Sequence, residues 1–200
     1  MTMNILVAGA TGKTGLQLVQ CLIDEGHKPT ALVRDSSDTS TLPPGVDVRQ
    51  GDLTDLQHGV CEGMEAVIFA AGSGGSTGPE MTDKVDRDGA KRLIDLAHKA
   101  GVTRFVMLSS VGADQSNPKG EMAHYLKAKH EADEHLKSSG MAYAILRPVA
   151  LTDDRRGADV ILGEDVDKSA KASRADVAHL LAEAATTGRF DGIAQDMQSV

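Results

Sequence analysis

The chain has 200 residues and a formal net charge of −8, and 40% of its residues are hydrophobic while 25% are charged. This length predicts one domain, and its core must be aliphatic because the chain contains no Trp, two Tyr and three Phe. The acidic balance argues against a nucleic-acid partner, and no run approaches the ~18 apolar residues of a membrane span.

The cysteines and histidines do not predict a metal site. Cys21 and Cys61 form no metal-ligand pair, and we interpret both as reduced structural residues of a cytoplasmic protein. His124, His130 and His135 share one predicted helix, but the first two lie on different faces of it. No metal is therefore expected.

Short apolar runs alternate with helical patterns along the chain. The runs predict strands within residues 3–10, 28–34, 46–53, 65–72, 104–110 and 142–151. Helices are predicted within residues 13–27, 86–102, 121–141 and 173–188. This alternation predicts an α/β doubly wound parallel sheet, a Rossmann fold of three αβα layers. The whole chain, 1–200, forms one domain in this reading, with about 150–200 contributing a small substrate-side region.

Two connecting segments lack a regular pattern. Residues 36–45 are interpreted as a surface connection. Residues 72–81 ("GSGGSTGPEM") follow a predicted strand at the edge where such sheets bind ligands, and they are rich in glycine. We expect this second segment to be mobile and able to close over a ligand.

The loop "GATGKTG" at residues 9–15 directly follows the first strand and precedes the first helix. In that context Gly9 permits a tight turn, Gly12 lets the backbone approach a pyrophosphate, and Gly15 lets the helix pack close to the strand. The helix N-terminus then presents free N–H groups to the phosphates. Lys13 does not have the spacing of a nucleoside-triphosphate P-loop. The loop therefore predicts a dinucleotide site.

Several motifs together resemble the extended and atypical branches of the short-chain dehydrogenase/reductase superfamily. The spacing G-x-x-G-x-x-G with "GATG" at its head is the first of them. The others are "GDL" at 51–53, "FAAG" at 69–72, the segment 85–113, "YLKAK" at 125–129, "RPVAL" at 147–151 and "SRADVAHLL" at 173–181. The chain is most similar to the small bacterial proteins described as NADH-flavin reductase-like or epimerase/dehydratase-like.

This resemblance implies a nicotinamide dinucleotide and a set of residues around it. The implied cofactor-binding residues are Gly9, Thr11, Gly12, Lys13, Thr14, Gly15, Arg34, Asp52, Leu53, Ala70, Ala71, Gly72, Lys129 and Pro148. Within this set the acidic residue of "GDL" is expected to meet the adenine ring. The "FAAG" segment is expected to pass beneath the riboses.

The end of the second predicted strand favours NADP(H) over NAD(H). An acidic residue there would bond the ribose 2′-hydroxyl and repel a 2′-phosphate, but this position is Arg34. A guanidinium pairs well with phosphate, and Ser36 and Ser37 are able to add hydrogen bonds. Asp35 lies one position later, where it is able to point to solvent.

A catalytic set is predicted from the end of one strand and the following helix. Tyr125 and Lys129 are four residues apart, hence on one helical face, and a nearby Lys makes a Tyr a usable acid or base. Ser110, fifteen residues before Tyr125, is the expected partner, with Ser109 as the alternative. The resemblance also gives Lys129 a role in binding the nicotinamide ribose.

The function predicted first is an NADP(H)-dependent oxidoreductase that reduces a small carbonyl, quinone or flavin. The alternatives are an epimerase or dehydratase with tightly held NAD(P), and a non-catalytic NADP(H)-sensing protein. Residues 188–200 ("GRFDGIAQDMQSV") are short and polar, unlike the further strand of longer relatives, which disfavours a large sugar-nucleotide cleft. A small-molecule substrate is expected, without nucleic acid or membrane, in a monomer or homodimer.

Overall fold

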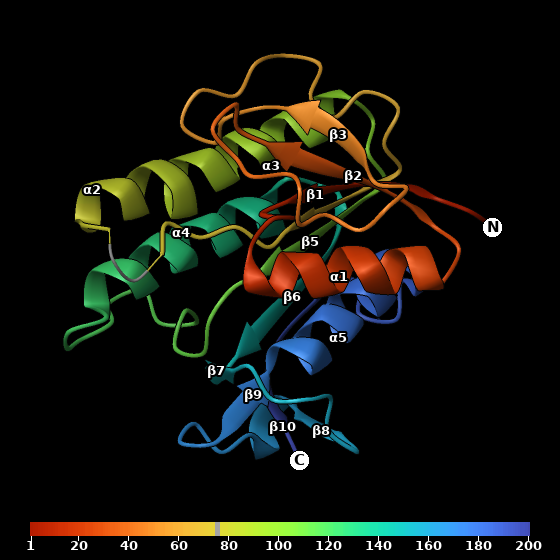
Figure 1. The fold of residues 1–200 in the computed structure, drawn as a ribbon. Helices are drawn as coiled ribbons and strands as arrows, with labels where there is room; N and C mark the ends of the chain where they lie inside the picture. Colours follow the sequence, from red (N-terminus) through yellow and green to blue (C-terminus); the bar gives the residue numbers. More distant parts are fainter. Residues whose placement is uncertain (75–76) are drawn as a thin grey trace.

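A sheet of eight strands forms the centre of the computed structural model, which describes residues 1–74 and 77–200. The strand order is β3-β2-β1-β4-β5-β6-β10-β8, with β10 and β8 antiparallel and the other neighbouring strands parallel. These strands are β1 (Asn4–Ala8), β2 (Lys28–Val33), β3 (Asp47–Gln50), β4 (Ala66–Phe69), β5 (Arg104–Leu108), β6 (Ala142–Pro148), β8 (Val160–Leu162) and β10 (Ile193–Ser199). The predicted doubly wound sheet is thus confirmed (Figure 1).

Helices cover both faces of this sheet (Figure 1). One face carries α1 (Lys13–Asp24) and α5 (Arg174–Thr187), and the other carries α3 (Ala90–Lys99) and α4 (Ala123–Ser138). Shorter helical segments are α2 (Pro79–Thr82), the π-helix η1 (Asp83–Gly89) and the 3-10 helix η2 (Gly163–Asp165). The three expected layers are therefore present, with a separate hydrophobic cluster on each side of the sheet.

The strands at the centre of the sheet are buried on both faces, which explains their continuously apolar sequences. Every side chain from Ile5 to Ala8, and every one from Ala66 to Phe69, is fully buried. β1 pairs in parallel with β2 on one side and β4 on the other, so its backbone groups are bonded despite their burial. The carboxyl ends of the parallel strands consequently meet at one edge of the sheet.

The helical segment after β4 begins earlier than the sequence pattern predicts. Helix was expected within residues 86–102, but α2 begins at Pro79, inside the segment 72–81 that was expected to be a mobile loop. Gly75 and Ser76 lie outside the described residues. The chain continues from α2 through η1 into α3, and π-helical turns of this kind occur frequently at functional sites.

The C-terminal residues form a strand, contrary to the expectation from sequence. β10 pairs in parallel with β6, from Ile193 beside Ala144 to Met197 beside Pro148, and also bonds β8. Its sequence is polar because five of its side chains are only partly buried and one is exposed, whereas Met197 is fully buried. The backbone groups at the edge of β6 bond this segment. Because β6 is distant in the chain, this pairing cannot be predicted from the local sequence.

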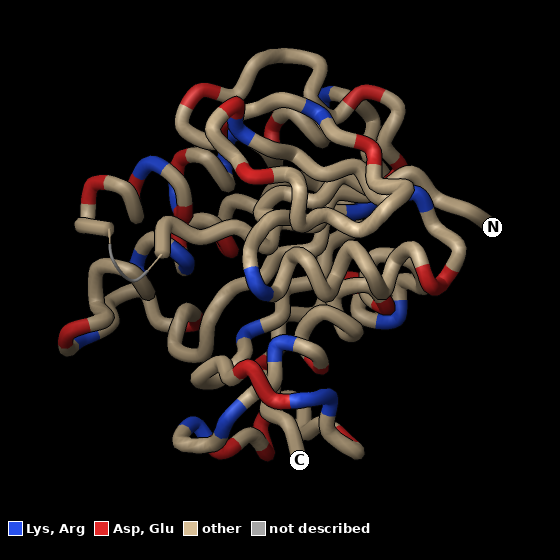
Figure 2. The backbone as a smooth tube through the Cα atoms, in the orientation of Figure 1, with Lys and Arg blue, Asp and Glu red and all other residues tan. Residues whose placement is uncertain are grey.

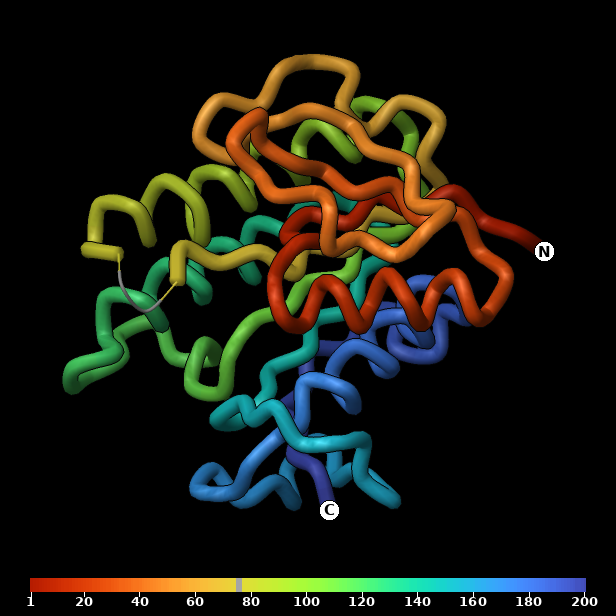
Figure 3. The backbone as a smooth tube through the Cα atoms, viewed as in Figure 1, coloured from red at the N-terminus to blue at the C-terminus, as the bar shows by residue number. Residues whose placement is uncertain are grey.

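Residues 149–173 lie beyond the carboxyl end of β6, at the lower end of the view in Figure 3. They contain a second, two-stranded parallel sheet of β7 (Ala150–Thr152) and β9 (Lys171–Ser173).

Acidic and basic residues are interspersed along the whole backbone (Figure 2). Among the residues that the structure describes, no helix combines the length and apolar character needed to cross a bilayer.

Asp176 ties this region to the start of α5 and to the C-terminus. Its carboxylate accepts hydrogen bonds from the hydroxyls of Ser173 (2.8 Å) and Ser199 (2.6 Å) and from the Gly157 N–H (3.1 Å). Ser173 in turn caps the helix by accepting from the Asp176 N–H at 3.0 Å. Burial alone would raise the pKa of Asp176, but these hydrogen bonds outweigh it and hold the pKa below its ordinary value.

Asp176→Asn is expected to lower the free energy of unfolding at neutral pH by about 1.5–3 kcal/mol, the value of hydrogen bonds to a charged group. A carboxyl with a depressed native pKa stabilises the fold above its unfolded pKa of about 3.9, and this contribution disappears as the pH falls through the native pKa. Urea unfolding at several pH values should therefore show the two proteins converging in acid. A difference that stays constant down to the acid limit would contradict this role.

Candidate functional site

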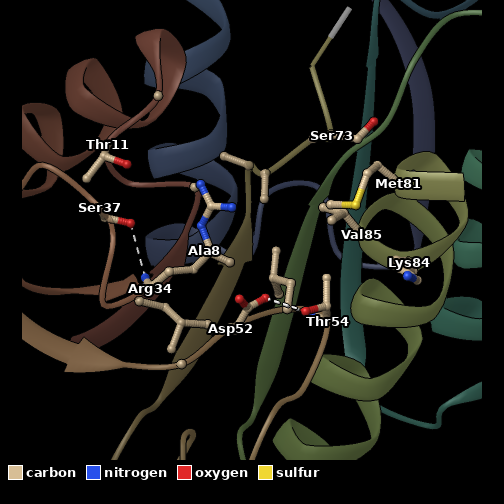
Figure 4. Close-up of a pocket in the computed structure, with 18 of the residues that line it drawn as sticks. Ala8, Thr11, Arg34, Ser37, Asp52, Thr54, Ser73, Met81, Lys84 and Val85 are labelled. Carbon is tan, nitrogen blue, oxygen red and sulfur yellow. Dashed lines mark hydrogen bonds between the residues drawn. The ribbon is translucent and has the colours of Figure 1, made fainter. Parts of the chain in front are cut away.

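A cavity of about 650 Å³ opens at the carboxyl edge of the sheet, beside the glycine loop. Figure 4 shows Arg34 and Ser37 on one wall and Asp52 and Thr54 below them, while residues of α2 and η1 form the opposite wall. The lining residues are Ala8, Gly9, Thr11, Gly12, Leu32, Arg34, Ser37, Gly51, Asp52, Leu53, Thr54, Ala70, Ala71, Gly72, Ser73, Thr77, Met81, Lys84 and Val85. Nine of the predicted cofactor-binding positions are in this set: Gly9, Thr11, Gly12, Arg34, Asp52, Leu53, Ala70, Ala71 and Gly72.

The glycine loop has the conformation that its spacing predicts. Gly9 has a φ of +85°, and a Cβ there would lie 2.6 Å from the Ala71 nitrogen, so the loop passes directly over the end of β4. A Cβ on Gly15 would lie 1.9 Å from the Gly9 oxygen, which only glycine avoids. Gly12 is exposed on the cavity side. The first and third glycines therefore serve packing, and the second faces the cavity.

Arg34 places a positive charge on the cavity wall at the end of β2. It directly follows β2, is exposed, and its backbone N–H donates to the Ser37 hydroxyl at 3.1 Å (Figure 4). Asp35 does not line the cavity. In the amide orientation that satisfies both of its polar atoms, Gln50 of β3 donates to the Asp35 carboxylate at 3.0 Å. The acid at the strand end is thus turned toward β3, and the guanidinium is left at the cavity.

Asp52 is held in place by Thr54, whose N–H and hydroxyl both donate to Oδ1 at 2.8 Å. The bond from the Thr54 N–H is the main cause that lowers the pKa of Asp52, and the Thr54 hydroxyl and the charge of Arg34 add to it against the effect of burial. The carboxylate is therefore ionised at neutral pH. Among the described residues Oδ2 receives no hydrogen bond, so it is available to a ligand.

The two serines after β5 have different surroundings. Ser109 is 4% exposed, and its hydroxyl donates to Asp133 Oδ2 at 2.9 Å. Ser110 is half-buried, and its hydroxyl makes only a long contact of 3.4 Å with the Val111 carbonyl. The Ser110 hydroxyl is therefore free of a strong internal partner among the described residues, while Ser109 is engaged inside the protein.

The turn that follows Ser110 is in contact with the part of α4 that directly follows Tyr125. A Cβ on Gly112 would lie 3.3 Å from the Leu126 side chain, and the Ala113 carbonyl lies 2.9 Å from a ring nitrogen of His130. These contacts place the turn after β5 against the segment of α4 that contains Lys129.

Lys129 is fully enclosed beneath Tyr125. Its ammonium lies 5.8 Å from the centre of the Tyr125 ring and 5.6 Å from that of Phe69, and it donates to the Leu108 carbonyl at 3.2 Å. Burial alone would lower the pKa of Lys129, but Tyr125 and the carboxylates of Asp86 and Asp133 outweigh this effect and hold the pKa above its ordinary value. The lysine therefore remains a cation.

Asp86, a residue outside the site predicted from the sequence, supplies the counter-charge. Its Oδ1 lies 3.2 Å from Lys129 Nζ and its Oδ2 accepts from the Ser73 N–H at 3.0 Å, so it connects the lysine to the rim of the cavity. A signal was available, because Asp86 precedes Ala90 and Leu93 by four and seven residues, on the buried stripe of the helix. An acidic residue at such a position requires a buried partner.

Five predicted cofactor-binding residues do not line the cavity. Lys13 is turned to Asp153 at 2.6 Å, and Asp153 also bonds Arg174 at 2.5 Å. Thr14 and Gly15 are buried at the start of α1, and Pro148 is buried at the end of β6. Lys129 lies behind Asp86, which is covered by Gly72 and Ser73. Lys129, a predicted catalytic residue, is thus separated from the cavity by Asp86 and by Gly72 and Ser73, which line the cavity.

The described parts of the chain contain no group of three or more His, Cys, Asp or Glu residues placed to hold a metal. Cys21 and Cys61 are both free thiols. Burial raises the pKa of Cys61 to about 12, so this thiol is inert.

Comparison with known proteins agrees with this geometry. A family model described as NAD(P)H-binding matches residues 9–187. The chain is 35% identical over 182 residues to YhfK of Bacillus subtilis, described as an uncharacterized sugar epimerase, with 88% of this chain and 85% of that protein covered.

Solved structures show the same similarity over the full chain. A Bacillus halodurans protein assigned as an NAD-dependent epimerase/dehydratase superimposes with a TM-score of 0.93 at 33% identity, covering 99% of this chain and 94% of that one. The oxidoreductase YlbE of Lactococcus lactis superimposes with a TM-score of 0.85 at 28% identity, covering 99% and 91%. With its glycine loop, Rossmann sheet and cavity, the chain belongs to the NAD(P)H-binding family, among proteins of the epimerase/dehydratase-like and reductase-like kinds.

Proposed function

We propose that this protein is an NADP(H)-dependent oxidoreductase that transfers a hydride to a small carbonyl, quinone or flavin. The observation that carries the proposal is the arrangement on α4, where Tyr125 and Lys129 share a face and the ammonium lies 5.8 Å from the phenol ring. Lys129 is joined through Asp86 to Ser73 at the rim of the cavity. A proton donor is thus held beside a site suited to a dinucleotide.

The cavity residues fit a dinucleotide. The volume of about 650 Å³ is in the range of small-molecule sites, and the loop before α1 presents backbone N–H groups and a helix N-terminus to phosphates. Asp52 Oδ2 is placed to accept a hydrogen bond from an adenine amino group. We assign Gly9, Thr11 and Gly12 to the phosphates.

Arg34 supports NADP(H) as the cofactor within this proposal. The guanidinium borders the cavity at the end of β2, the neighbouring Ser37 lines the same wall, and Asp35 is bonded to Gln50 instead. An arginine here pairs with a 2′-phosphate, whereas an acid would repel it.

The residues around the substrate have separable roles. A bound reduced nicotinamide supplies the hydride. The Ser110 hydroxyl donates a hydrogen bond to the substrate oxygen, and the Tyr125 hydroxyl transfers its proton to that oxygen, so that a carbonyl becomes an alcohol. Lys129, kept cationic beside Asp86, stabilises the phenolate that remains.

An epimerase or dehydratase is the second candidate, favoured by the descriptions of YhfK and of the Bacillus halodurans protein. The structure leaves little chain for a nucleotide-sugar cleft, because β10 joins the main sheet and residues 149–173 alone lie beyond β6 on the substrate side. This short substrate-side region favours a small acceptor.

The glycine loop provides a prediction that separates folding from binding. Gly15→Ala is expected to destabilise the protein by at least about 3 kcal/mol, because the new Cβ meets the Gly9 carbonyl at 1.9 Å. Gly12→Ala meets the same oxygen at 3.3 Å and is expected to fold but to bind NADPH at least about 10-fold more weakly, since its methyl group projects into the phosphate site. Urea unfolding and fluorescence titration measure the two effects. Equal destabilisation by both variants would contradict this division of roles.

The function is tested by following NADPH oxidation with menadione, flavin mononucleotide and benzaldehyde as separate acceptors, with NADH in parallel. Turnover that prefers NADPH supports the proposal. If no acceptor supports turnover, incubation with UDP-galactose and UDP-glucose, read by nuclear magnetic resonance, tests the epimerase. Binding of NADPH without any turnover would instead favour a cofactor-sensing protein.

A further inference from the structure

Beneath Ser110, side chains from three elements meet at a buried carboxylate. Asp133 of α4 accepts the Ser109 hydroxyl at 2.9 Å and the Arg147 guanidinium of β6 at 3.1 Å (Nε) and 2.9 Å (Nη2), all at Oδ2. Asp133 is 0% exposed, and Ser109 and Arg147 are 4% and 5% exposed. This cluster of Ser109, Asp133 and Arg147 has no part in the reaction described above.

The cluster lies on the same helical face as the proposed proton donor. Tyr125, Lys129 and Asp133 follow one another at intervals of four residues, so they form one row along α4. Lys129 bonds η1 through Asp86 and β5 through the Leu108 carbonyl, while Asp133 bonds Ser109, directly after β5, and Arg147 of β6. The row therefore holds the helix to three neighbouring elements by directional contacts.

Stability alone does not explain a buried ion pair in this place. Removing a carboxylate and a guanidinium from water is costly, and well-packed apolar residues frequently replace such pairs without loss of stability. Apolar neighbours on α4, such as Ala132 and Leu136, decide which face of the helix packs on the sheet, but their contacts are not directional and leave the exact rotation about the helix axis less closely defined. The hydrogen bonds that Ser109, after β5, and Arg147, in β6, donate to Asp133 Oδ2 are directional and do specify this rotation.

We propose that Asp133, held by Ser109 and Arg147, is a positioning residue that sets the rotation and height of α4 so that Tyr125 faces Ser110. The inference rests on the oxidoreductase proposed above. It also explains why adjacent serines differ: Ser109 orients the carboxylate, and Ser110 is left for the substrate.

The test compares two kinds of conservative change. Asp133→Asn removes the charge, and Asp133→Glu keeps the charge but moves the carboxylate by one methylene. Both are expected to lower kcat at least about 10-fold while the KM for NADPH stays within about 3-fold, because misplacing a reacting group by about 1 Å costs up to about 100-fold in rate. Ser109→Thr, which keeps the hydroxyl, is expected to retain the wild-type kcat, and Ser109→Ala to lose several-fold. His135→Ala is the matched control, since His135 lies on α4 like Asp133 but makes an exposed contact with Asp95 of α3.

A second measurement does not depend on turnover. Tyr125 and Tyr143 are the two tyrosines of the chain, and there is no Trp. In a Tyr143→Phe background the ultraviolet absorbance of phenolate therefore reports Tyr125 alone. The charged groups around Lys129, next to this phenol, are Asp86 from η1 and Asp133 from α4, and Arg147 from β6 is paired with Asp133. Asp133→Glu and Asp133→Asn are both expected to shift the ionisation midpoint, because a displaced α4 changes the position of the phenol relative to the charges of Lys129 and Asp86.

The outcomes separate the two proposals. If Asp133→Glu behaves as wild type in kcat and in the titration, the cluster contributes only charge and the inference is overturned. It is also overturned if Ser109→Ala and Ser109→Thr have equal kcat values, which decides the question should the Asp133 variants fail to fold. If the wild type turns over no acceptor, the oxidoreductase proposal fails, and the Tyr125 titration alone then decides whether Asp133 positions the helix.

Discussion

Tyr125→Phe is expected to lower the rate of NADPH oxidation at least about 100-fold and to leave the Kd for NADPH within about 2-fold, because a positioned general acid contributes about 100- to 10,000-fold. The phenol lies above the Lys129 ammonium and outside the cavity that we assign to the cofactor, so its removal takes away the proton donor but not a cofactor contact. Steady-state kinetics and fluorescence titration with NADPH measure the two quantities separately.

Tyr143→Phe is the matched control for this prediction. Tyr143 is equally half-buried but lies in β6, outside the cavity, and its backbone carbonyl rather than its ring bonds Gly192. Wild-type turnover in this control together with a large loss in Tyr125→Phe assigns the proton transfer. Unchanged turnover in Tyr125→Phe with a flavin acceptor would mean direct hydride transfer without a tyrosine, and the role of Tyr125 would be wrong.

Arg34→Ala is expected to weaken NADPH binding by about 10- to 150-fold, which corresponds to about 1.5–3 kcal/mol for charge-assisted hydrogen bonds. NADH binding is expected to change by less than about 2-fold, since NADH has no 2′-phosphate for the guanidinium to pair with. Arg34 is exposed, so added salt should reduce the preference of the wild type for NADPH and have little effect on the variant.

Arg92→Ala controls for the loss of a positive charge from an acidic protein. Arg92 is exposed on α3 and does not line the cavity. Competitive titration of wild type, Arg34→Ala and Arg92→Ala with both dinucleotides provides the comparison. Equal weakening of NADPH and NADH by Arg34→Ala would show that Arg34 supports the adenosine generally, and NADP(H) specificity would have to come from other residues.

Local patterns determined the fold and one half of the site. The glycine loop was predicted from its place between an apolar run and a helix, and Gly9 and Gly15 adopt the close contacts that this motif requires. Arg34 was predicted because it directly follows a strand, whereas Asp52 and the "FAAG" segment were implied by the family resemblance. Arg34, Asp52, Ala70, Ala71 and Gly72 line the cavity, while Phe69 is buried within β4. In a parallel sheet the residues after the strands reach the same edge, which is why these positions meet.

Contacts between distant elements were not predictable in the same way. The sequence left Ser109 and Ser110 as alternatives, and they differ only because Asp133 of α4 approaches one of them. Asp86 was missed because its partner, Lys129, is far away in the chain and on another helix. A buried charge is understood only when its counter-charge is located, and that depends on how helices pack.

The sequence by itself determined the alternation of the first six strands with the four longer helices, the dinucleotide loop and the row of Tyr125 and Lys129, because each depends on spacing within one segment. The tertiary structure decided that residues 193–199 form a strand, that Lys13 turns to Asp153, and that Asp86 and Asp133 hold α4. These features depend on what another part of the chain offers, whether a strand edge or an opposite charge, and no local pattern records that.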